Sequence, residues 1–124
     1  MWILDPRSVG KYSDGDRAGR CDIVWLQFSP QAGHEQGGHR PALVLSPSAY
    51  NNKTGLMVCC PMTTQVKGYP FEVVVAGKQV AVVLADQVKS LDWVARKAQR
   101  KGKVTPAELS EVRAKLLVLL GSPS

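Results

Sequence analysis

The stretch DIVWLQF, residues 22–28, indicates a β-strand, because its β-branched and aromatic residues pack well on a sheet. Four further runs of similar character follow it: ALVLS (42–46), LMVCCPM (56–62), FEVVVAG (71–77) and AVVLADQV (81–88). Between the runs lie segments whose residues favour turns and loops: SPQAGHEQGGHRP (29–41), SPSAYNNKTG (46–55), TTQVKGYP (63–70) and GKQ (77–79), the last short enough for a hairpin. The pattern predicts a small, mainly antiparallel sheet that curves into a partial barrel.

The C-terminal segment predicts an α-helix with both ends marked. Thr105 suits the N-cap, Pro106 the first helical position, and Glu108 completes a capping box, while Gly121 can close the far end. Apolar residues recur at helical spacing, namely Leu109, Val112, Leu116, Leu119 and Leu120. We expect this stripe to pack on the sheet, and a surface kept for a partner is the alternative.

Length and composition indicate one domain, since 124 residues with 44% hydrophobic content can bury a modest core. Residues 1–20 lack periodicity, so we expect a flexible N-terminal extension, a domain of residues 21–121 and a tail of residues 122–124. Residues 1–20 lack the apolar run of a signal peptide, and no stretch is long enough to span a membrane, so we expect neither a signal peptide nor a membrane anchor. A net charge of +6 and a pI of about 9.5 favour a polyanion such as nucleic acid, or an acidic protein, as partner.

The three cysteines do not form a disulfide framework, because the number is odd and Cys59 and Cys60 are adjacent, pointing to opposite faces of a strand. We therefore expect reduced thiols and a cytoplasmic protein. The two histidines, His34 and His39, lie in a glycine-rich loop, and the chain has no CxxC or HxxxH spacing. These patterns predict no metal site and no cofactor.

The loop GHEQGGHRP, residues 33–41, is the first candidate for a functional site. Its glycines let the backbone approach a ligand, and Pro41 biases Arg40 toward an extended conformation at the start of the next strand. A guanidinium anchored there offers a planar fork of donors that fits a phosphate. Taken from the loop alone, an ordinary surface ion pair is the commoner role for such an arginine.

The segment PMTTQVKGYP, residues 61–70, is the second candidate. Thr63 and Thr64 follow a strand, where hydroxyls can donate to a phosphate oxygen, and Lys67 precedes a glycine. Two threonines at a strand end are more often simple β-formers or caps. A groove for a phosphodiester becomes attractive only if the two segments converge in the fold.

The residues from Cys21 to about Gly121 resemble the MazF/PemK toxins of bacterial toxin–antitoxin modules. The resemblance is carried by motifs in the family's order: GDIVW, here with Cys21 for the usual Gly, then GxEQxGxRP, PxTTQ and DQVKS. It implies an SH3-like barrel that works as a homodimer and cleaves single-stranded mRNA at specific sequences, without a metal ion, to inhibit translation and growth. A MazE-like acidic antitoxin is the implied partner.

The resemblance also implies site residues. The family's catalytic arginine and threonine fall on Arg40 and Thr63. Other positions match segments that line the family's RNA groove: Gln27, Glu35, His39, Thr64, Gln65, Lys67, Asp86 and Gln87. The implied reaction is attack by the substrate's own 2′-hydroxyl on the adjacent phosphorus, which leaves a 2′,3′-cyclic phosphate and a 5′-hydroxyl.

Arg40 is expected to stabilise charge, because a guanidinium stays protonated and is no proton acceptor. His39 and Glu35 are the candidates for general base or acid, and the sequence does not decide between them. Cys21 departs from the family pattern, and Gln27 stands where relatives can carry an acid. Two other functions are alternatives. One is a gyrase-binding toxin of the CcdB type, disfavoured because the chain ends Gly-Ser-Pro-Ser and not Trp-Gly-Ile; the other is a non-catalytic SH3-like module that binds nucleic acid or protein.

Overall fold

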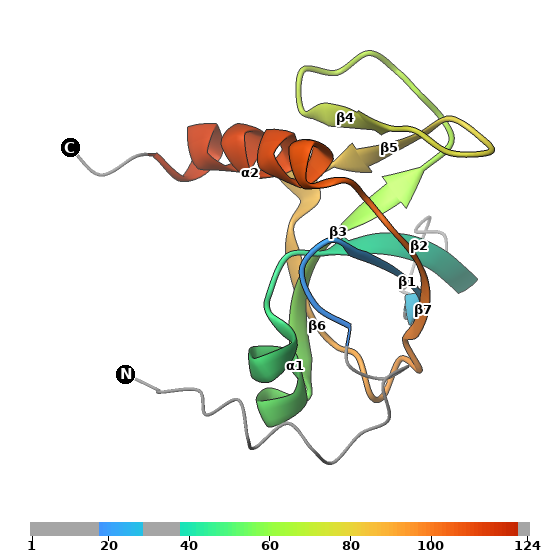
Figure 1. The fold of residues 1–124 in the computed structure, drawn as a ribbon, viewed down its shortest axis with the longest axis vertical. Helices are drawn as coiled ribbons and strands as arrows, with labels where there is room; N and C mark the ends of the chain where they lie inside the picture. Colours follow the sequence, from blue (N-terminus) through green and yellow to red (C-terminus); the bar gives the residue numbers. More distant parts are fainter. Residues whose placement is uncertain (1–17, 29–37, 122–124) are drawn as a thin grey trace, which may run out of the picture.

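The computed structural model describes residues 18–28 and 38–121 (Figure 1). The strands are β1 Asp22–Phe28, β2 Gly38–Val44, β3 Leu56–Thr63, β4 Glu72–Val75, β5 Ala81–Leu84, β6 Lys89–Asp92 and β7 Gln99–Lys103; the helices are α1 Ser48–Thr54, the short 3₁₀ helix η3 Ala85–Gln87 and α2 Pro106–Leu120. Most of the predicted N-terminal extension, the predicted tail and the loop residues His34 and Glu35 lie outside the described residues. Ala18 and Gly19, which precede the predicted start of the domain, are buried.

The strands form one antiparallel sheet in the order β4-β5-β3-β2-β1-β7. Strand β3 is central, because it pairs with β2 along one edge and with β6 and then β5 along the other. The sheet curls around this long strand, and α2 lies beside β4 and η3 (Figure 1). The prediction of a curved, antiparallel partial barrel with a C-terminal helix is confirmed.

The two faces of β3 belong to two separate hydrophobic clusters, and the adjacent cysteines divide between them. Cys59 packs with Val24, Leu26 and Trp93, whereas Cys60 packs with Val73, Val83 and Val112. All three cysteines are free thiols. Burial raises the pKa of both Cys59 and Cys60 to about 12, so these thiols stay protonated and unreactive at neutral pH.

Helix α2 begins as predicted but packs over only part of its length. Thr105 Oγ1 accepts a hydrogen bond from the Glu108 amide, and the Glu108 carboxylate accepts one from the Thr105 amide. Leu109 and Val112 are buried in the core. The expectation that the whole stripe packs on the sheet is wrong for its C-terminal half, because the helix runs past the sheet edge there. The exposed apolar side chains are Leu117, Val118, Leu119 and Leu120.

Three elements were not expected from the sequence. Helix α1 lies in a segment predicted as a loop, since Ser and Asn have low helix propensity and here tertiary hydrogen bonds decide the conformation. Strand β7 is made of five exposed, mostly charged residues, which give no strand signal, and it forms because it pairs with β1. Strand β6 is separated from β5 by η3, so the predicted run 81–88 ends early at Leu84.

Strand β2 begins at Gly38, which places Arg40 inside the strand.

Candidate functional site

The antiparallel pairing of β2 with β3 brings the two candidate segments to the same end of the sheet. Their last paired residues are Ala42 and Pro61, and Arg40 and Thr63 each lie two residues beyond this pair on the same side of it. Residues opposite one another in an antiparallel pair share a face of the sheet. The arginine and the hydroxyl, 23 positions apart in the sequence, therefore both lie at this end, which we call the Arg40 site.

The surroundings of Arg40 differ from those of an ordinary surface ion pair. The Arg40 side chain is half-buried, and across the β1–β2 ladder Arg40 pairs with the fully buried Leu26 of β1. Within residues 18–28 and 38–121, no carboxylate forms an ion pair with it; the ion pairs found there join Asp22 to Arg100 and to Lys103. A guanidinium in a strand with no carboxylate partner among the described residues is suited to bind an external anion.

Thr63 is positioned as a hydrogen-bond donor. Its Oγ1 accepts a hydrogen bond from the Gln65 amide at 3.1 Å, which fixes the hydroxyl at the point where β3 ends. An amide that occupies an acceptor position on the oxygen leaves the O–H itself available to donate. The side chain is half-buried, so the hydroxyl is held in place but still reachable.

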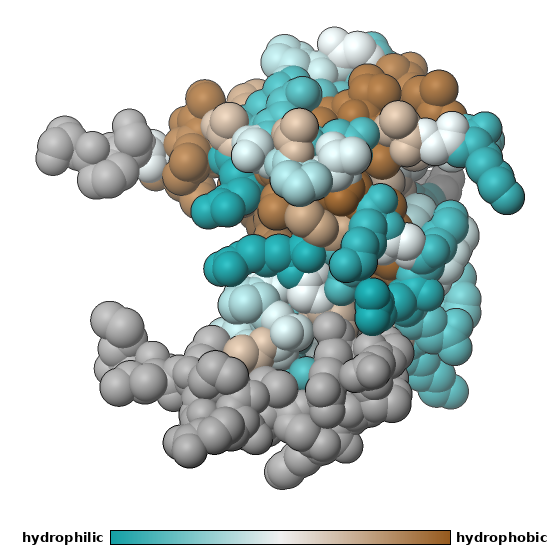
Figure 2. Space-filling view, in the orientation of Figure 1, coloured by the Kyte–Doolittle hydropathy of each residue, from teal (hydrophilic) through white to brown (hydrophobic). Residues whose placement is uncertain are grey.

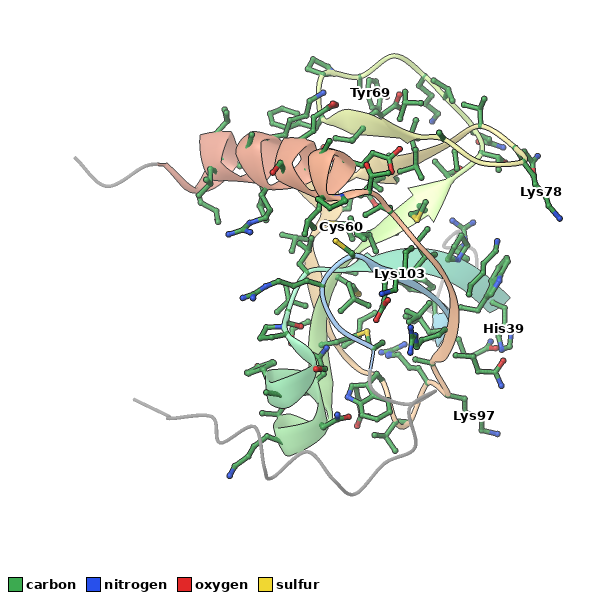
Figure 3. All side chains as sticks on the ribbon, viewed as in Figure 1. His39, Cys60, Tyr69, Lys78, Lys97 and Lys103 are labelled. Carbon is green, nitrogen blue, oxygen red and sulfur yellow. The ribbon has the colours of Figure 1, made fainter. Side chains whose placement is uncertain are left out.

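Gln27 and His39 stand opposite each other in the β1–β2 ladder, one residue away from Arg40. Because neighbours on a strand alternate between faces, this pair lies on the face opposite to the one Arg40 uses. His39 is exposed and projects from the outer end of β2 (Figure 3). From this position, the imidazole reaches the Arg40 face only around the end of the strand.

The remaining predicted RNA-binding residues fall into two groups. Thr64, Gln65 and Lys67 continue directly from Thr63 in an exposed loop. Asp86 and Gln87 form part of η3, where Cys60 Sγ contacts the Ala85 carbonyl at 3.9 Å. Cys60 is three residues from Thr63 along β3, or roughly 10 Å, so η3 contacts β3 about that far before the Arg40 site.

Two cations near Gln27 were not among the predicted site residues. Arg96 Nη1 donates to the backbone carbonyl of Gln27 at 3.3 Å, and the backbone N–H of Gln27 donates to the backbone carbonyl of Arg96 at 2.9 Å. The ammonium of Lys89 lies 5.5 Å from the ring centre of Phe28, the next residue. Lys89 belongs to the DQVKS motif, which gave a signal for it, whereas nothing in the local sequence marks Arg96.

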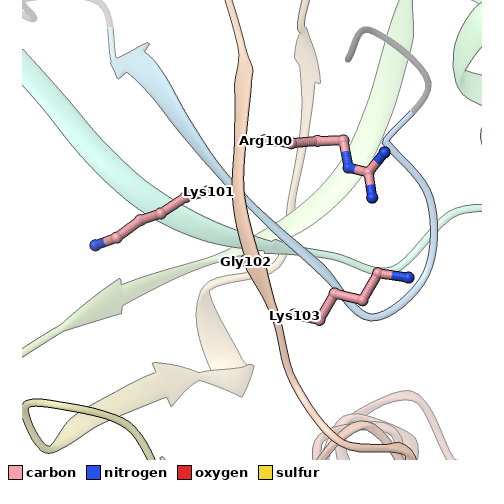
Figure 4. Close-up of a pocket in the computed structure, with 4 residues that line it drawn as sticks. All are labelled: Arg100, Lys101, Gly102 and Lys103. Carbon is pink, nitrogen blue, oxygen red and sulfur yellow. The ribbon is translucent and has the colours of Figure 1, made fainter. Parts of the chain in front are cut away.

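A second cationic surface lies along β7 and is separate from the Arg40 site. A shallow hollow there is lined by Arg100, Lys101, Gly102 and Lys103, and Figure 4 shows Arg100 and Lys103 projecting to one side and Lys101 to the other. Arg100 and Lys103 approach the buried Asp22 at 3.8 and 3.9 Å, and Lys101 lies over the Trp25 ring at 4.1 Å. These contacts give the β7 cations a structural role.

Within the described ranges, no group of three or more His, Cys, Asp or Glu side chains is placed to hold a metal ion. Among the described helices, none has both the length and the apolar character needed to cross a bilayer.

The sequence matches a known protein family over most of its length. The profile of the PemK-like, MazF-like toxin of type II toxin–antitoxin systems matches residues 19–120. The endoribonuclease toxin MazF of Escherichia coli (strain K12) is 58% identical over 101 residues, which cover 81% of this chain and 91% of that protein. The endoribonuclease PemK of Escherichia coli is 33% identical over 121 residues, covering 92% of this chain and 88% of that protein.

Solved structures agree with this match. The crystal structure of MazF (Form-I) from Deinococcus radiodurans has a TM-score of 0.78 and 54% identity, covering 85% of this chain and 97% of that one. A MazE–MazF crystal structure (Form-II) from the same organism gives a TM-score of 0.79 at 53% identity, covering 86% and 98%. The chain therefore belongs to the PemK-like, MazF-like toxins of type II toxin–antitoxin systems.

Proposed function

We propose that this protein is the endoribonuclease toxin of a type II toxin–antitoxin pair and that it cleaves single-stranded mRNA at the Arg40 site, in the cytoplasm and without a metal ion. What supports the proposal is the β2–β3 pairing, whose last pair, Ala42 and Pro61, lies two residues from Arg40 and from Thr63, together with the absence of a described carboxylate paired to the arginine. The family match and the 58% identity to an endoribonuclease toxin support the activity.

In the proposed reaction, the 2′-oxygen of the substrate forms a bond to phosphorus while the bond from phosphorus to the 5′-oxygen breaks. The products are a 2′,3′-cyclic phosphate and a 5′-hydroxyl, and DNA is no substrate because it lacks the nucleophile. Negative charge gathers on the non-bridging oxygens in the transition state. Arg40 and the Thr63 hydroxyl stabilise that charge, and one such fixed donor is worth about 3–4 kcal/mol.

A general base must take the 2′-hydroxyl proton, and a general acid must protonate the leaving 5′-oxygen. His39 and Glu35 remain the candidates. His39 leaves β2 on the face opposite to Arg40, so it serves only if the RNA wraps around the end of the strand. Glu35 lies outside the described residues. Comparing the pH dependence of kcat for His39→Gln and Glu35→Gln distinguishes the two, because removing the base abolishes one limb of the profile.

The partners follow from charge and from the apolar end of α2. A MazE-like acidic antitoxin segment would compete with RNA for the same cations, including Lys67 and Lys89, and so block the site. A second copy of the chain is the proposed occupant of the α2 end, where Leu117–Leu120 are exposed. A hollow beside Leu116 has a mixed lining of Arg20, Leu45, Ser46, Val58, Arg113 and Leu116. Figure 2 shows hydrophobic surface, coloured brown, at the left end of α2. The expected species in solution is a homodimer.

The test is to incubate the purified protein with a long single-stranded transcript in EDTA and to map the cuts by primer extension. We expect cuts at a short recurring sequence, with 2′,3′-cyclic phosphate ends identified by mass spectrometry. Thr63→Val should lower kcat about 100-fold, whereas Ser110→Ala, an exposed hydroxyl on α2, should cut like the wild type. RNA that is bound but left intact would favour the non-catalytic module, and gyrase inhibition without cleavage would favour the CcdB type.

A further inference from the structure

The loop of residues 64–71, between β3 and β4, combines a fixed backbone with outward-facing side chains. Its residues from Thr64 to Pro70 are all exposed, including the large side chains Val66 and Tyr69. Tyr69 lies on this loop above β4 (Figure 3). These side chains are not part of the core. Core packing therefore does not hold the loop in place, and hydrogen bonds to its backbone do.

The first brace is the carboxylate of Glu72, the first residue of β4. Its oxygens accept hydrogen bonds from the Gly68 amide at 2.9 Å and from the Lys67 amide at 3.1 and 3.3 Å. Gly68 has φ +83°, a left-handed conformation that turns the two consecutive amides toward one anion. Only 8% of Glu72 is exposed, so the fold buries a charged group in order to hold an exposed loop.

The second brace comes from helix α2. Lys115 Nζ donates to the Pro70 carbonyl at 2.6 Å and to the Glu72 carbonyl at 2.9 Å, which clamps the end of the loop to the helix. The Glu72 amide donates to the Tyr69 carbonyl at 3.1 Å and completes the turn. Glu72 therefore fixes the middle of the loop and Lys115 fixes its end.

We infer that Glu72 and Lys115 are positioning residues that hold Thr64, Gln65 and Lys67 in the conformation that reads RNA next to Thr63. The inference rests on the proposed function, because it assigns these side chains to the RNA bound at the Arg40 site. Neither brace touches RNA. Their loss should weaken substrate binding and blur the choice of cut sequence, while a substrate phosphate that does reach Arg40 still reacts at a nearly normal rate.

The test compares Glu72→Gln and Lys115→Met with two matched controls, Glu111→Gln and Lys78→Met, which remove exposed charges of the same sign. The measurements are kcat and KM on a short RNA that holds one mapped cut site, and the cut-site profile on a long transcript. For Glu72→Gln we expect KM to rise about tenfold, with kcat within about threefold of wild type, and the cut-site profile to broaden. Lys115→Met should act in the same direction but less strongly, and Lys115→Arg should restore the profile.

A merely structural role predicts a different result. If Glu72→Gln lowers the melting temperature but leaves KM and the cut-site profile unchanged, the positioning role is wrong. If Glu72→Gln does not fold, Lys115→Met decides on the same criteria. Amide exchange gives a readout without catalysis: protection of the Lys67 and Gly68 amides should be lost in Glu72→Gln, and retained protection contradicts the brace. Failure of the wild type to cut any RNA, by contrast, counts against the proposed function and leaves the exchange result to judge the brace.

Discussion

The two ends of strand β2 carry polar clusters of opposite kinds. Beyond Val44, Asn51 Nδ2 donates to the carbonyls of Ala18 at 2.7 Å and Ser46 at 3.1 Å, and its Oδ1 accepts from the Ser46 hydroxyl. The Trp93 indole donates to the Asn51 carbonyl at 2.7 Å. Every polar atom of this fully buried side chain is satisfied within the protein. We call this group the Asn51 cluster.

At the other end, the Arg40 site holds an arginine without a described carboxylate partner and a threonine whose O–H is free to donate. Hydrogen bonds closed inside the protein stabilise the fold, since an unmade bond to a buried group costs free energy. Groups anchored by the backbone but left open are available to a ligand. The difference separates residues that build the fold from residues that act on a substrate.

The largest expected effect is on catalysis at the Arg40 site. Arg40→Ala should lower kcat/KM for RNA by about 100- to 1,000-fold, because it removes the donor that stabilises the transition-state charge. Its free energy of unfolding should fall by about 1 kcal/mol or less, because no described hydrogen bond or ion pair is lost and only part of the side chain is buried. Single-turnover cleavage and urea unfolding measure the two quantities.

Arg40→Lys serves as the companion variant, because it keeps the charge but loses the planar fork. An activity between those of wild type and Arg40→Ala supports two-pronged binding of phosphate. A large loss of stability in Arg40→Ala would place Arg40 among the residues that build the fold and would remove the contrast between the two ends.

The second largest effect is on stability, at the Asn51 cluster. Asn51→Asp has nearly the same shape but replaces two donors with an acceptor that faces two carbonyl oxygens, so we expect a loss of about 3 kcal/mol in the free energy of unfolding. The neighbour Asn52 is the matched control, since it is buried but its side-chain amide makes no hydrogen bond within the described structure. Asn52→Ala should cost about 1 kcal/mol or less. Equal losses in the two variants would show that burial, and not the hydrogen bonds, sets the stability.

The sequence predicted the sheet and the residues of the Arg40 site better than it predicted the Asn51 cluster. Runs of β-branched residues marked four of the seven described strands closely, and the capping box of Thr105 and Glu108 marked the start of α2. The family motifs singled out Arg40 and Thr63, and both residues follow the last β2–β3 pair, Ala42 and Pro61, at the same end of the sheet. Local sequence describes periodicity and caps, so it works where a segment's own residues decide its conformation.

The elements that the sequence did not predict depend on contacts between distant segments. Helix α1 and the Asn51 cluster depend on bonds from Asn51 to Ala18 and from Trp93 to Asn51, which no local pattern encodes. The exposed end of α2 could not be told from a core stripe, since the same leucine spacing suits either surface. The Glu72 brace was missed because a glutamate at the start of a strand carries no signal that its oxygens face two amides.

A smaller effect on stability is expected at Cys21, which lies at the same end of the sheet as the Asn51 cluster. Cys21 has φ +75°, a left-handed conformation that costs a side-chain residue about 1–2 kcal/mol and costs glycine little. The family motif GDIVW has Gly at this position, which suits the left-handed conformation. Cys21→Gly should raise the free energy of unfolding by about 1 kcal/mol, after the entropy that glycine adds to the unfolded chain is subtracted. Cys21→Ala keeps the Cβ and should give no gain, so a similar rise in both variants would point to the thiol and not to the backbone.

The smallest effect concerns Glu108, whose carboxylate is satisfied internally although it lies near the surface. Hydrogen bonds from the Thr105 and Ala76 amides lower the pKa of Glu108 below its ordinary value of 4.5. A lowered carboxyl pKa stabilises the fold above the ordinary value, and this contribution is lost as the pH falls through the pKa of the folded state. Glu108→Gln should therefore cost about 0.5 kcal/mol at pH 7, and the difference from wild type should shrink below pH 4.5. Urea unfolding across this range, with the exposed Glu111→Gln as control, measures it. A cost that does not change with pH would mean that shape, and not charge, matters at this cap.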